Sequence, residues 1–283
     1  MFNFLKYHKA NKFYLRFKWT KNKYDTQCYN DYMSPELLAK LLNLSSQAGE
    51  IIMDFRKKSP DYLIKDDNTP LTQADKASHE FLLNELTKLT PNTPILSEES
   101  SHIPFSIRES WEEYWLIDPL DGTRDFIDGS PDFCISIALI KNHYPDFGLI
   151  YSPFDKVHYY RLNQGPSIKL VNKQTQKILT SKPKRWEKIV VGRYSINNKN
   201  LKEHLKLKTN FETFKLGSAL KFCLIAEGVY HYYPKFGRCS EWDTAAGICI
   251  LEGSGGRVVD LENKALKFNL TDDIISPSFI ATA

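Results

Sequence analysis

The chain has 283 residues, of which 42% are hydrophobic and 25% are charged, and its formal net charge is +4. This is the composition of an ordinary globular protein that can bury one large core or two closely packed ones. No apolar run reaches the 18 residues of a transmembrane helix. The sequence also lacks the Gly-x-x-x-x-Gly-Lys-Ser/Thr and Gly-x-Gly-x-x-Gly motifs, which argues against the common nucleotide-binding loops.

The spacing of the cysteines and histidines argues against a zinc site. The five cysteines are scattered without a Cys-x-x-Cys pair, and the seven histidines form no His-x-x-x-His or His-Glu-x-x-His pattern. We expect the cysteines to be small buried thiols in a reducing compartment, which predicts a cytoplasmic location.

Residues 1–32 carry the basic excess of the whole chain. They hold seven Lys or Arg against two Asp, together with ten aromatic residues, whereas the remainder has a net charge of −1. This basic aromatic extension lacks the apolar core of a secretory signal. Two interpretations stay open. The extension is translated sequence upstream of Met33 that the protein does not need, or it touches nucleic acid or a membrane surface, such as the cytoplasmic face of the inner membrane.

Two helices are predicted directly after this extension. Ser34-Pro35 is an N-cap followed by proline at the first helical position, and apolar residues recur at helical spacing over residues 37–55. A polar turn is expected at Asp66-Asp67-Asn68. The second helix spans about Thr72 to Leu89, and Asp75 stands at the third position of a capping box.

The expected strands fall into two series. The first series comprises residues 94–97, 115–117, 133–140, 147–151, 157–161 and 167–171. Its short connections favour an antiparallel sheet, and hence an α+β half of residues 33–175. In the second series, residues 176–283, strands alternate with helices, which favours an α/β half. The expected strands there are residues 189–191, 212–216, 229–233, 257–261 and 279–282, and the expected helices are residues 200–207, 218–227 and 241–253.

The most informative segment follows the short strand at residues 115–117. It reads Asp118-Pro119-Leu120-Asp121-Gly122-Thr123. Because Pro119 has no N–H and does not continue a central strand, we expect the strand to end at Asp118 and the chain to turn. The carboxylates of Asp118 and Asp121 would repel each other unless a cation or a proton lies between them. Mg²⁺ prefers oxygen ligands and is the natural neutraliser; a plain surface turn is the alternative.

A second acidic strand end points to the same place. Glu98-Glu99 follows the strand at residues 94–97, within twenty residues of Asp118. An acidic pair at a strand end is usually only solvated. Two such ends, reached from neighbouring strands, instead suggest one shared site.

Four segments together resemble the inositol monophosphatase superfamily of Mg²⁺-dependent, lithium-sensitive phosphatases. They are Pro70 to Asp75, Ser97 to Glu99, Asp118 to Thr123 and Glu241 to Gly247. Within the superfamily, the segments Leu216 to Cys223, Ala226 to Gly228 and Tyr233 to Gly237 are similar to the branch of 3′(2′),5′-bisphosphate nucleotidases. The resemblance runs from about Met33 to the last residue. It implies a layered αβαβα sandwich whose C-terminal half completes the active site.

The resemblance assigns a role to each matching residue. The implied metal ligands, for two or three Mg²⁺ ions, are Glu98, Asp118, Leu120 through its carbonyl, Asp121 and Asp243. Asp75 and Thr123 look like the pair that orients and deprotonates the attacking water. The implied substrate contacts are Glu98, Asp118, Leu120, Asp121, Gly122, Thr123, Gly217, Ser218, Lys221, Lys235 and Asp243.

Simpler structural roles remain open for four parts of this set. Asp75 and Asp243 would serve as helix caps, Lys221 as a solvated helix lysine, and Gly217-Ser218 as the start of a helix. Two departures from the nucleotidase pattern also bear on the substrate. Arg124-Asp125 replaces the common Lys-Glu, and Ser195 stands where nucleotidases often carry a histidine that contacts the nucleotide.

The sequence therefore predicts a phosphatase that removes the 3′-phosphate of adenosine 3′,5′-bisphosphate (PAP) to give AMP and phosphate. The sulfated nucleotide PAPS is a further candidate substrate. The expected partner is this small phosphate ester and not a nucleic-acid polymer. An inositol or other sugar phosphatase is the nearest alternative. A non-catalytic metal- or anion-binding protein is disfavoured, because such a protein has no need of a water-activating pair.

Overall fold

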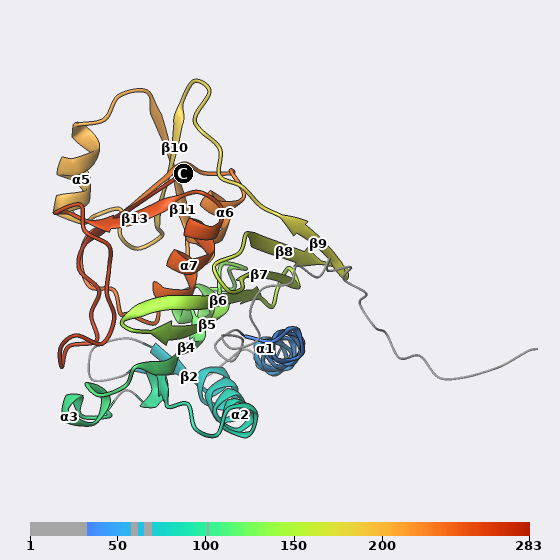
Figure 1. Cartoon of the computed structure of the whole chain (residues 1–283). Coiled ribbons are helices and arrows are strands. Elements are labelled where there is room, and N and C mark those ends of the chain that lie inside the picture. The colour runs from blue at the N-terminus through green and yellow to red at the C-terminus, as the bar shows by residue number, and fades with distance from the viewer. Residues whose placement is uncertain (1–32, 58–61, 65–69, 101) are drawn as a thin grey trace, which may run out of the picture. The chain divides into compact units, whose positions relative to one another are not determined.

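A computed structural model describes residues 33–57, 62–64, 70–100 and 102–283 (Figure 1). The basic aromatic extension and the polar turn expected at Asp66-Asp67-Asn68 lie outside the described residues. Met33–Ala283 form one compact unit, which contains a seven-stranded sheet and a five-stranded sheet. Among the described helices, none combines the length and the apolar character that crossing a membrane requires.

The first sheet has seven strands in the order β3-β4-β5-β6-β7-β8-β9. Their bounds are β3 Ile95–Ser97, β4 Glu113–Asp121, β5 Cys134–Lys141, β6 Tyr144–Ser152, β7 Val157–Arg161, β8 Ser167–Val171 and β9 Gln174–Lys177. Every neighbouring pair is antiparallel except β3 and β4, which are parallel. The predicted antiparallel series is thus confirmed. Strand β9 was not predicted, because all four of its residues are polar and exposed.

The expected end of β4 at Asp118 is wrong, since the strand continues through Pro119 to Asp121. The pairing with β5 shifts between the Asp118–Ser136 and Asp121–Cys134 pairs, so β4 contains one extra residue there. This is a β-bulge, where proline is tolerated because no ladder N–H is required. The missing N–H of Pro119 therefore interrupts the pairing without turning the chain.

Helices α1 Pro35–Arg56 and α2 Gln73–Leu89 cover one face of this sheet (Figure 1). Both predicted helix starts are confirmed. Ser34 Oγ accepts the Leu37 N–H at 3.1 Å, and Thr72 with Asp75 forms the capping box. The buried residues that α1 and α2 direct at the sheet are Leu41, Leu44, Ala48, Ile52, Ala74, Leu82 and Leu86. A short hairpin, β1 Tyr62–Ile64 and β2 Pro70–Thr72, precedes α2.

The second sheet has five strands in the order β11-β10-β12-β14-β13. Their bounds are β10 Glu187–Gly192, β11 Phe211–Leu216, β12 Tyr232–Lys235, β13 Arg257–Asp260 and β14 Phe279–Thr282. Strand β10 is parallel to β11 and β12, as the α/β pattern predicts. Strand β14 is antiparallel to its neighbours β12 and β13, so the sheet is mixed.

Helices α6 Leu220–Ala226 and α7 Ala245–Gly253 lie between the two sheets (Figure 1). The largest buried cluster joins their apolar residues to the second face of the first sheet and to one face of the second sheet. Helix α5 Lys199–Lys206 packs Leu201 on the opposite face of the second sheet. The order helices, sheet, helices, sheet, helix is the predicted αβαβα sandwich.

Three element bounds in the second half were predicted too early in the chain. Helix α6 begins at Leu220 and not at Ser218, because Ser218 has a left-handed backbone with φ of 49°. Helix α7 begins at Ala245, because residues 241–244 form turns. Strand β12 begins at Tyr232, since the chain first turns after Gly228, where φ is 78°.

Candidate metal centre and active site

Three aspartates from two distant segments of the chain meet at one point. Asp118 and Asp121 flank the bulge of β4, and Asp243 lies in the turns before α7. One carboxylate oxygen from each lies within 4.8 Å of the others. Glu98 opens the short 3-10 helix η1 (Glu98–Ser100) directly after β3, and its charge acts on both Asp118 and Asp121. The structure thus brings together the acids that the sequence analysis grouped.

The electrostatics of this cluster favour a bound cation. Burial, followed by repulsion from Glu98, Asp121 and Asp243, raises the pKa of Asp118 well above its usual value. Burial and the neighbouring Asp243 raise the pKa of Asp121 to about 7. Burial also raises the pKa of Asp243. Carboxyl groups whose pKa is raised in this way keep their protons unless a cation takes the place of the protons.

Each aspartate of the cluster accepts a backbone N–H on one carboxylate oxygen. Asp118 Oδ1 accepts the Leu120 N–H at 3.0 Å, and Asp243 Oδ2 accepts the Ser240 N–H at 2.9 Å. Asp121 Oδ2 accepts the Ala219 N–H at 2.5 Å. These donors fix the direction in which each carboxylate points, while the second oxygen of each remains a ligand for a cation.

The donor set fits a hard divalent ion. The cluster offers carboxylate oxygens only, and the carbonyl oxygen of the adjacent Leu120 lies 3.1 Å from the Thr123 hydroxyl oxygen. Mg²⁺ takes oxygen ligands of this kind, whereas zinc sites are usually built from nitrogen and sulfur. The residues present therefore suit the ion that the motif predicts.

Asp75 and Thr123 make the contact that water activation requires. Thr123 Oγ1 donates to Asp75 Oδ1 at 2.9 Å. The other oxygen, Asp75 Oδ2, accepts the Thr72 N–H at 2.8 Å and the Thr72 hydroxyl. Asp75 is thus a helix cap and the partner of Thr123 at the same time, one oxygen serving each role. Burial raises the pKa of Asp75 to about 6, against the hydrogen bonds from Thr72 and Thr123.

Gly122 connects the β4 bulge to the short helix α4 Thr123–Ile127. Its φ is 93°, and a Cβ there would lie 2.8 Å from the Asp132 carbonyl oxygen. No other residue type fits this position without strain. Gly122 therefore holds Thr123 in place. The substrate contact assigned to Gly122 stays a prediction.

The two candidate lysines lie in different surroundings. Lys221 on α6 is only 6% exposed, and its Nζ donates to the Ser218 carbonyl and, at 3.4 Å, to that of Leu216. Burial lowers its pKa, against the nearby Asp121 charge. The alternative of a solvated helix lysine is therefore wrong. Lys235 ends β12, is half-buried, and lowers the pKa of Asp243.

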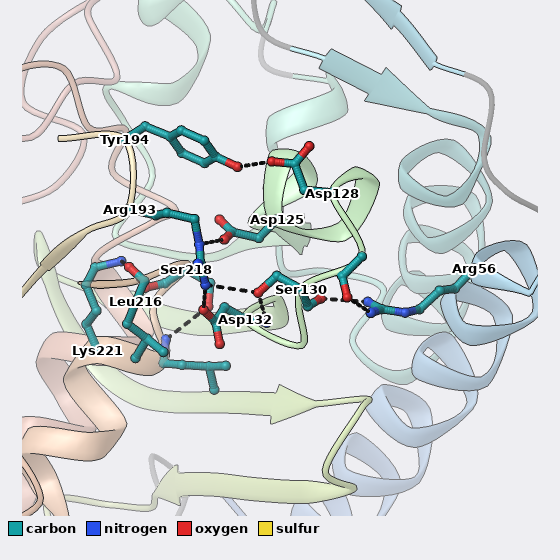
Figure 2. A network of polar contacts seen from close by, with 12 residues as sticks. Arg56, Asp125, Asp128, Ser130, Asp132, Arg193, Tyr194, Leu216, Ser218 and Lys221 are labelled. Atoms are coloured by element: carbon teal, nitrogen blue, oxygen red, sulfur yellow. Dashed lines mark hydrogen bonds and ion pairs between the residues drawn. The ribbon is translucent and has the colours of Figure 1, made fainter. Parts of the chain in front are cut away.

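Sequence reasoning missed two supports of the site. The Ala219 N–H on Asp121 is a backbone group, and no side-chain pattern announces it. Arg193 bonds Asp125 and Asp132, more than sixty residues earlier in the chain (Figure 2). In the sequence, only the replacement of the common Lys-Glu by Arg124-Asp125 indicated that this segment differs from the nucleotidase pattern. Ser195 lies in the turn after β10, where its N–H donates to the Gly192 carbonyl at 2.9 Å.

Comparison with known proteins gives a consistent result. A model of the inositol monophosphatase family matches residues 34–283. The chain is 38% identical over 251 residues to 3′(2′),5′-bisphosphate nucleotidase CysQ of Salmonella typhimurium, which covers 87% of this chain and 99% of that protein. It is 37% identical over 248 residues to the CysQ of Escherichia coli K12, with coverage of 86% and 98%.

Solved structures agree at the level of the fold. CysQ from Bacteroides thetaiotaomicron superposes with a TM-score of 0.74 at 30% identity, over 87% of this chain and 96% of that one. An inositol monophosphatase from Thermotoga maritima superposes with a TM-score of 0.73 at 24% identity, over 87% and 92% of the two chains, which shows the shared fold alone.

Proposed function

The chain belongs to the inositol monophosphatase family, and we propose that it is a Mg²⁺-dependent 3′(2′),5′-bisphosphate nucleotidase. Its leading substrate would be PAP, cleaved at the 3′ position to AMP and phosphate, with PAPS as a second substrate. The observation that carries this proposal is the joint presence of three clustered aspartates and the Thr123–Asp75 hydrogen bond. The relatives named as nucleotidases, at 35–38% identity, support the choice of substrate.

In this proposal Glu98, Asp118, Asp121, Asp243 and the Leu120 carbonyl hold two or three Mg²⁺ ions. Bound Mg²⁺ supplies positive charge that offsets the phosphate dianion, favours ionisation of water and stabilises the departing oxygen. The protein's contribution is to keep these oxygens directed at one point, through the backbone N–H groups on Asp118, Asp121 and Asp243.

The Thr123–Asp75 pair is suited to moving a proton. The Thr123 hydroxyl gives its hydrogen to Asp75 Oδ1, so Thr123 Oγ1 remains free to accept a hydrogen from water. As that water attacks phosphorus, its proton passes to Thr123 Oγ1 and the hydroxyl proton passes to Asp75 Oδ1. The bond from phosphorus to the 3′-oxygen breaks, and this oxygen leaves with the bonding electron pair and takes a proton from solvent. A pKa of about 6 makes Asp75 an effective base near neutral pH, because efficiency is greatest when the pKa lies close to the working pH.

A bisphosphate also needs positive charge beside the metal centre to hold its second phosphate. We assign this role to Lys235, with Lys221, Gly217 and Ser218 shaping the wall beside it. Lys235 acts electrostatically on both Asp243 and Lys221, so its ammonium lies near the acid cluster. Binding energy from a remote phosphate can position the reacting end of a substrate. An inositol monophosphate lacks that second phosphate.

The setting of the enzyme is part of the same proposal. The four described cysteines, Cys134, Cys223, Cys239 and Cys249, are buried and free, which suits a reducing compartment such as the cytoplasm. Membrane contact through the basic aromatic extension stays a prediction, since residues 1–32 lie outside the described part of the chain.

A substrate panel tests the proposal. Purified protein with Mg²⁺ is given PAP, PAPS, inositol 1-phosphate and glucose 1-phosphate, and phosphate release is measured, with an Asp118→Asn variant as the blank. We expect PAP and PAPS to be turned over with the highest kcat/KM. A preference for inositol 1-phosphate would move the protein to the inositol phosphatase branch. No release from any ester would leave a non-catalytic ion-binding protein.

A further inference from the structure

A polar network that the mechanism above does not use joins the segment after β10 to residues 125–132 (Figure 2). Its centre is Arg193, the first residue after β10. The Arg193 Nε donates to Asp125 Oδ1 at 2.6 Å, and Nη2 donates to Ser130 Oγ at 3.1 Å and to Asp132. The side chains of Asp125 and Asp132 are only 5% and 13% exposed. One guanidinium, directly after β10, thus holds two nearly buried carboxylates, one in α4 and one in the segment before β5.

Arg193 is the main positive charge acting on Asp125. Burial raises the pKa of Asp125, Arg193 and then Lys221 oppose that shift, and Asp132 adds to it. The Arg193 side chain is 37% exposed, so its ion pairs are partly screened by water. Its removal would still leave two nearly buried carboxylates without this hydrogen-bond donor, which favours a change in the local conformation.

The Asp125 carboxylate and the Asp132 backbone carbonyl form the surface against which Gly217 packs. A Cβ at Gly217 would lie 2.6 Å from Asp125 Cγ and 2.5 Å from the Asp132 carbonyl oxygen. The backbone at the end of β11 therefore touches the network directly, with no space for a side chain. A movement of Asp125 or Asp132 would therefore displace the Gly217 backbone.

Two residues beyond Gly217, the chain reaches the metal centre. The Ala219 N–H donates to Asp121 Oδ2 at 2.5 Å. The intervening Ser218 has a left-handed backbone, and its carbonyl accepts the buried Lys221 ammonium, so the short segment has little freedom of its own. The position of the Ala219 N–H therefore depends on the position of the Gly217 backbone.

We propose that Arg193 is a positioning residue of the metal centre. By holding Asp125 and Asp132 against Gly217, it keeps the Ala219 N–H on Asp121 and so fixes the direction of that carboxylate. The inference rests on the proposed function only in taking Asp121 as a metal ligand. Changes to residues that orient metal ligands typically cost about 10–100-fold in metal affinity or activity.

Lysine should not replace Arg193. The guanidinium reaches Asp125 through Nε and Asp132 through Nη2, in a planar fork that matches two acceptors. An ammonium is a point charge on a flexible stem and cannot hold both carboxylates in this geometry. Arg193→Lys therefore keeps the charge of the network while removing its geometry.

The test is a titration of the full-length protein with Mn²⁺, followed by electron paramagnetic resonance as a direct measure of binding. The samples are the wild type, Arg193→Ala, Arg193→Lys and Tyr194→Phe. The last variant is a matched control, because the Tyr194 hydroxyl bonds Asp128 of the same loop at 2.5 Å without a bond to Asp125 or Asp132. Thermal unfolding of the same samples reports the folded fraction.

We expect both Arg193 variants to bind Mn²⁺ about 10–100-fold more weakly than the wild type, and Tyr194→Phe to bind it equally well. Wild-type Mn²⁺ affinity in folded Arg193 variants, even with a lower Tm, would overturn the inference and leave Arg193 a purely structural residue. If Arg193→Ala does not fold, Arg193→Lys and Asp132→Asn provide the same test. A wild type that binds no Mn²⁺ would overturn the proposed function as well.

Discussion

The acidic and basic sides of the site are built in opposite ways. Each of the three clustered aspartates is held by a backbone N–H, so the ligand side is rigid before any ion binds. On the basic side, Lys221 is occupied by two backbone carbonyls, whereas Lys235 has no hydrogen-bond or ion-pair partner among the described residues. We therefore propose that the scaffold fixes the acid cluster and that substrate choice depends on the Lys235 ammonium.

Loss of a ligand should have the largest effect. Asp243→Asn and Asp118→Asn remove one negative charge each from the cluster with little change in volume, and we expect both to abolish Mg²⁺-dependent phosphate release. Isothermal titration with Mg²⁺ should show the matching loss of binding. Near-normal turnover of Asp243→Asn in Mg²⁺ would mean that the second half does not close the metal site.

A change in the pair Asp75 and Thr123 should lower the rate of the reaction without weakening Mg²⁺ binding. A positioned base typically contributes about 10²–10⁴-fold, so Thr123→Ala should lower kcat by that factor while Mg²⁺ affinity stays close to the wild type. Thr123→Ser keeps the hydroxyl and is the matched control, expected to retain most of the turnover. If Thr123→Ala loses Mg²⁺ binding instead, Thr123 is a support for the Leu120 carbonyl and not part of a proton path.

The features that the sequence predicted correctly depend on residues that are close together in the chain. Asp118, Asp121 and Thr123 lie in one short motif, and local signals such as the Ser34 cap and the Thr72–Asp75 box place the helices that support it. These features depend on neighbours a few residues away, so the sequence displays them directly.

What the sequence missed depends on contacts between distant segments. The Ala219 N–H meets Asp121 across 98 positions, and Arg193 meets Asp125 across 68. The burial of Lys221 follows from the packing of α6 between two sheets, which helical periodicity alone does not show. The bulge at Pro119 was mistaken for a turn because the sequence does not show the register in which β4 pairs with β5.

A smaller effect concerns pH and stability. Burial and the neighbouring Asp243 raise the pKa of Asp121 to about 7 in the folded protein, above the value of about 3.9 for an unperturbed aspartate. Between these values the folded protein binds more protons than the unfolded chain, so rising pH destabilises the metal-free fold. Without metal, we expect Tm to fall as pH rises from about 4 to about 7. Added Mg²⁺ should raise Tm more at pH 8 than at pH 5, measured by differential scanning fluorimetry.

The reverse pattern would contradict the electrostatic account of the cluster. If Mg²⁺ stabilised the protein more at pH 5 than at pH 8, protons and cations would not be competing for the same carboxylates. Asp243→Asn is the control here, because it removes the charge that, after burial, contributes most to the raised pKa of Asp121.

The smallest expected effect is that of removing residues 1–32. Every residue assigned to the site lies after Met33, whose N–H donates to Asn163 Oδ1 at 3.0 Å and whose carbonyl accepts the Asn163 amide at 3.0 Å. A chain that starts at Met33 should therefore fold and retain wild-type kcat/KM. A truncated protein that is insoluble or inactive would show that the extension is required by the rest of the chain.

The central claim, that a fixed metal side acts together with one free ammonium on a bisphosphate, is tested most directly by kcat/KM for PAP and for 3′-AMP. These substrates differ only in the 5′-phosphate. A charge-assisted hydrogen bond contributes about 1.5–3 kcal/mol, or roughly 10–150-fold. We expect wild type and the exposed control Lys177→Ala to prefer PAP by that factor, and Lys235→Ala to lose the preference while keeping its rate on 3′-AMP. Equal kcat/KM for both substrates in the wild type, or equal losses on both in Lys235→Ala, would contradict the account.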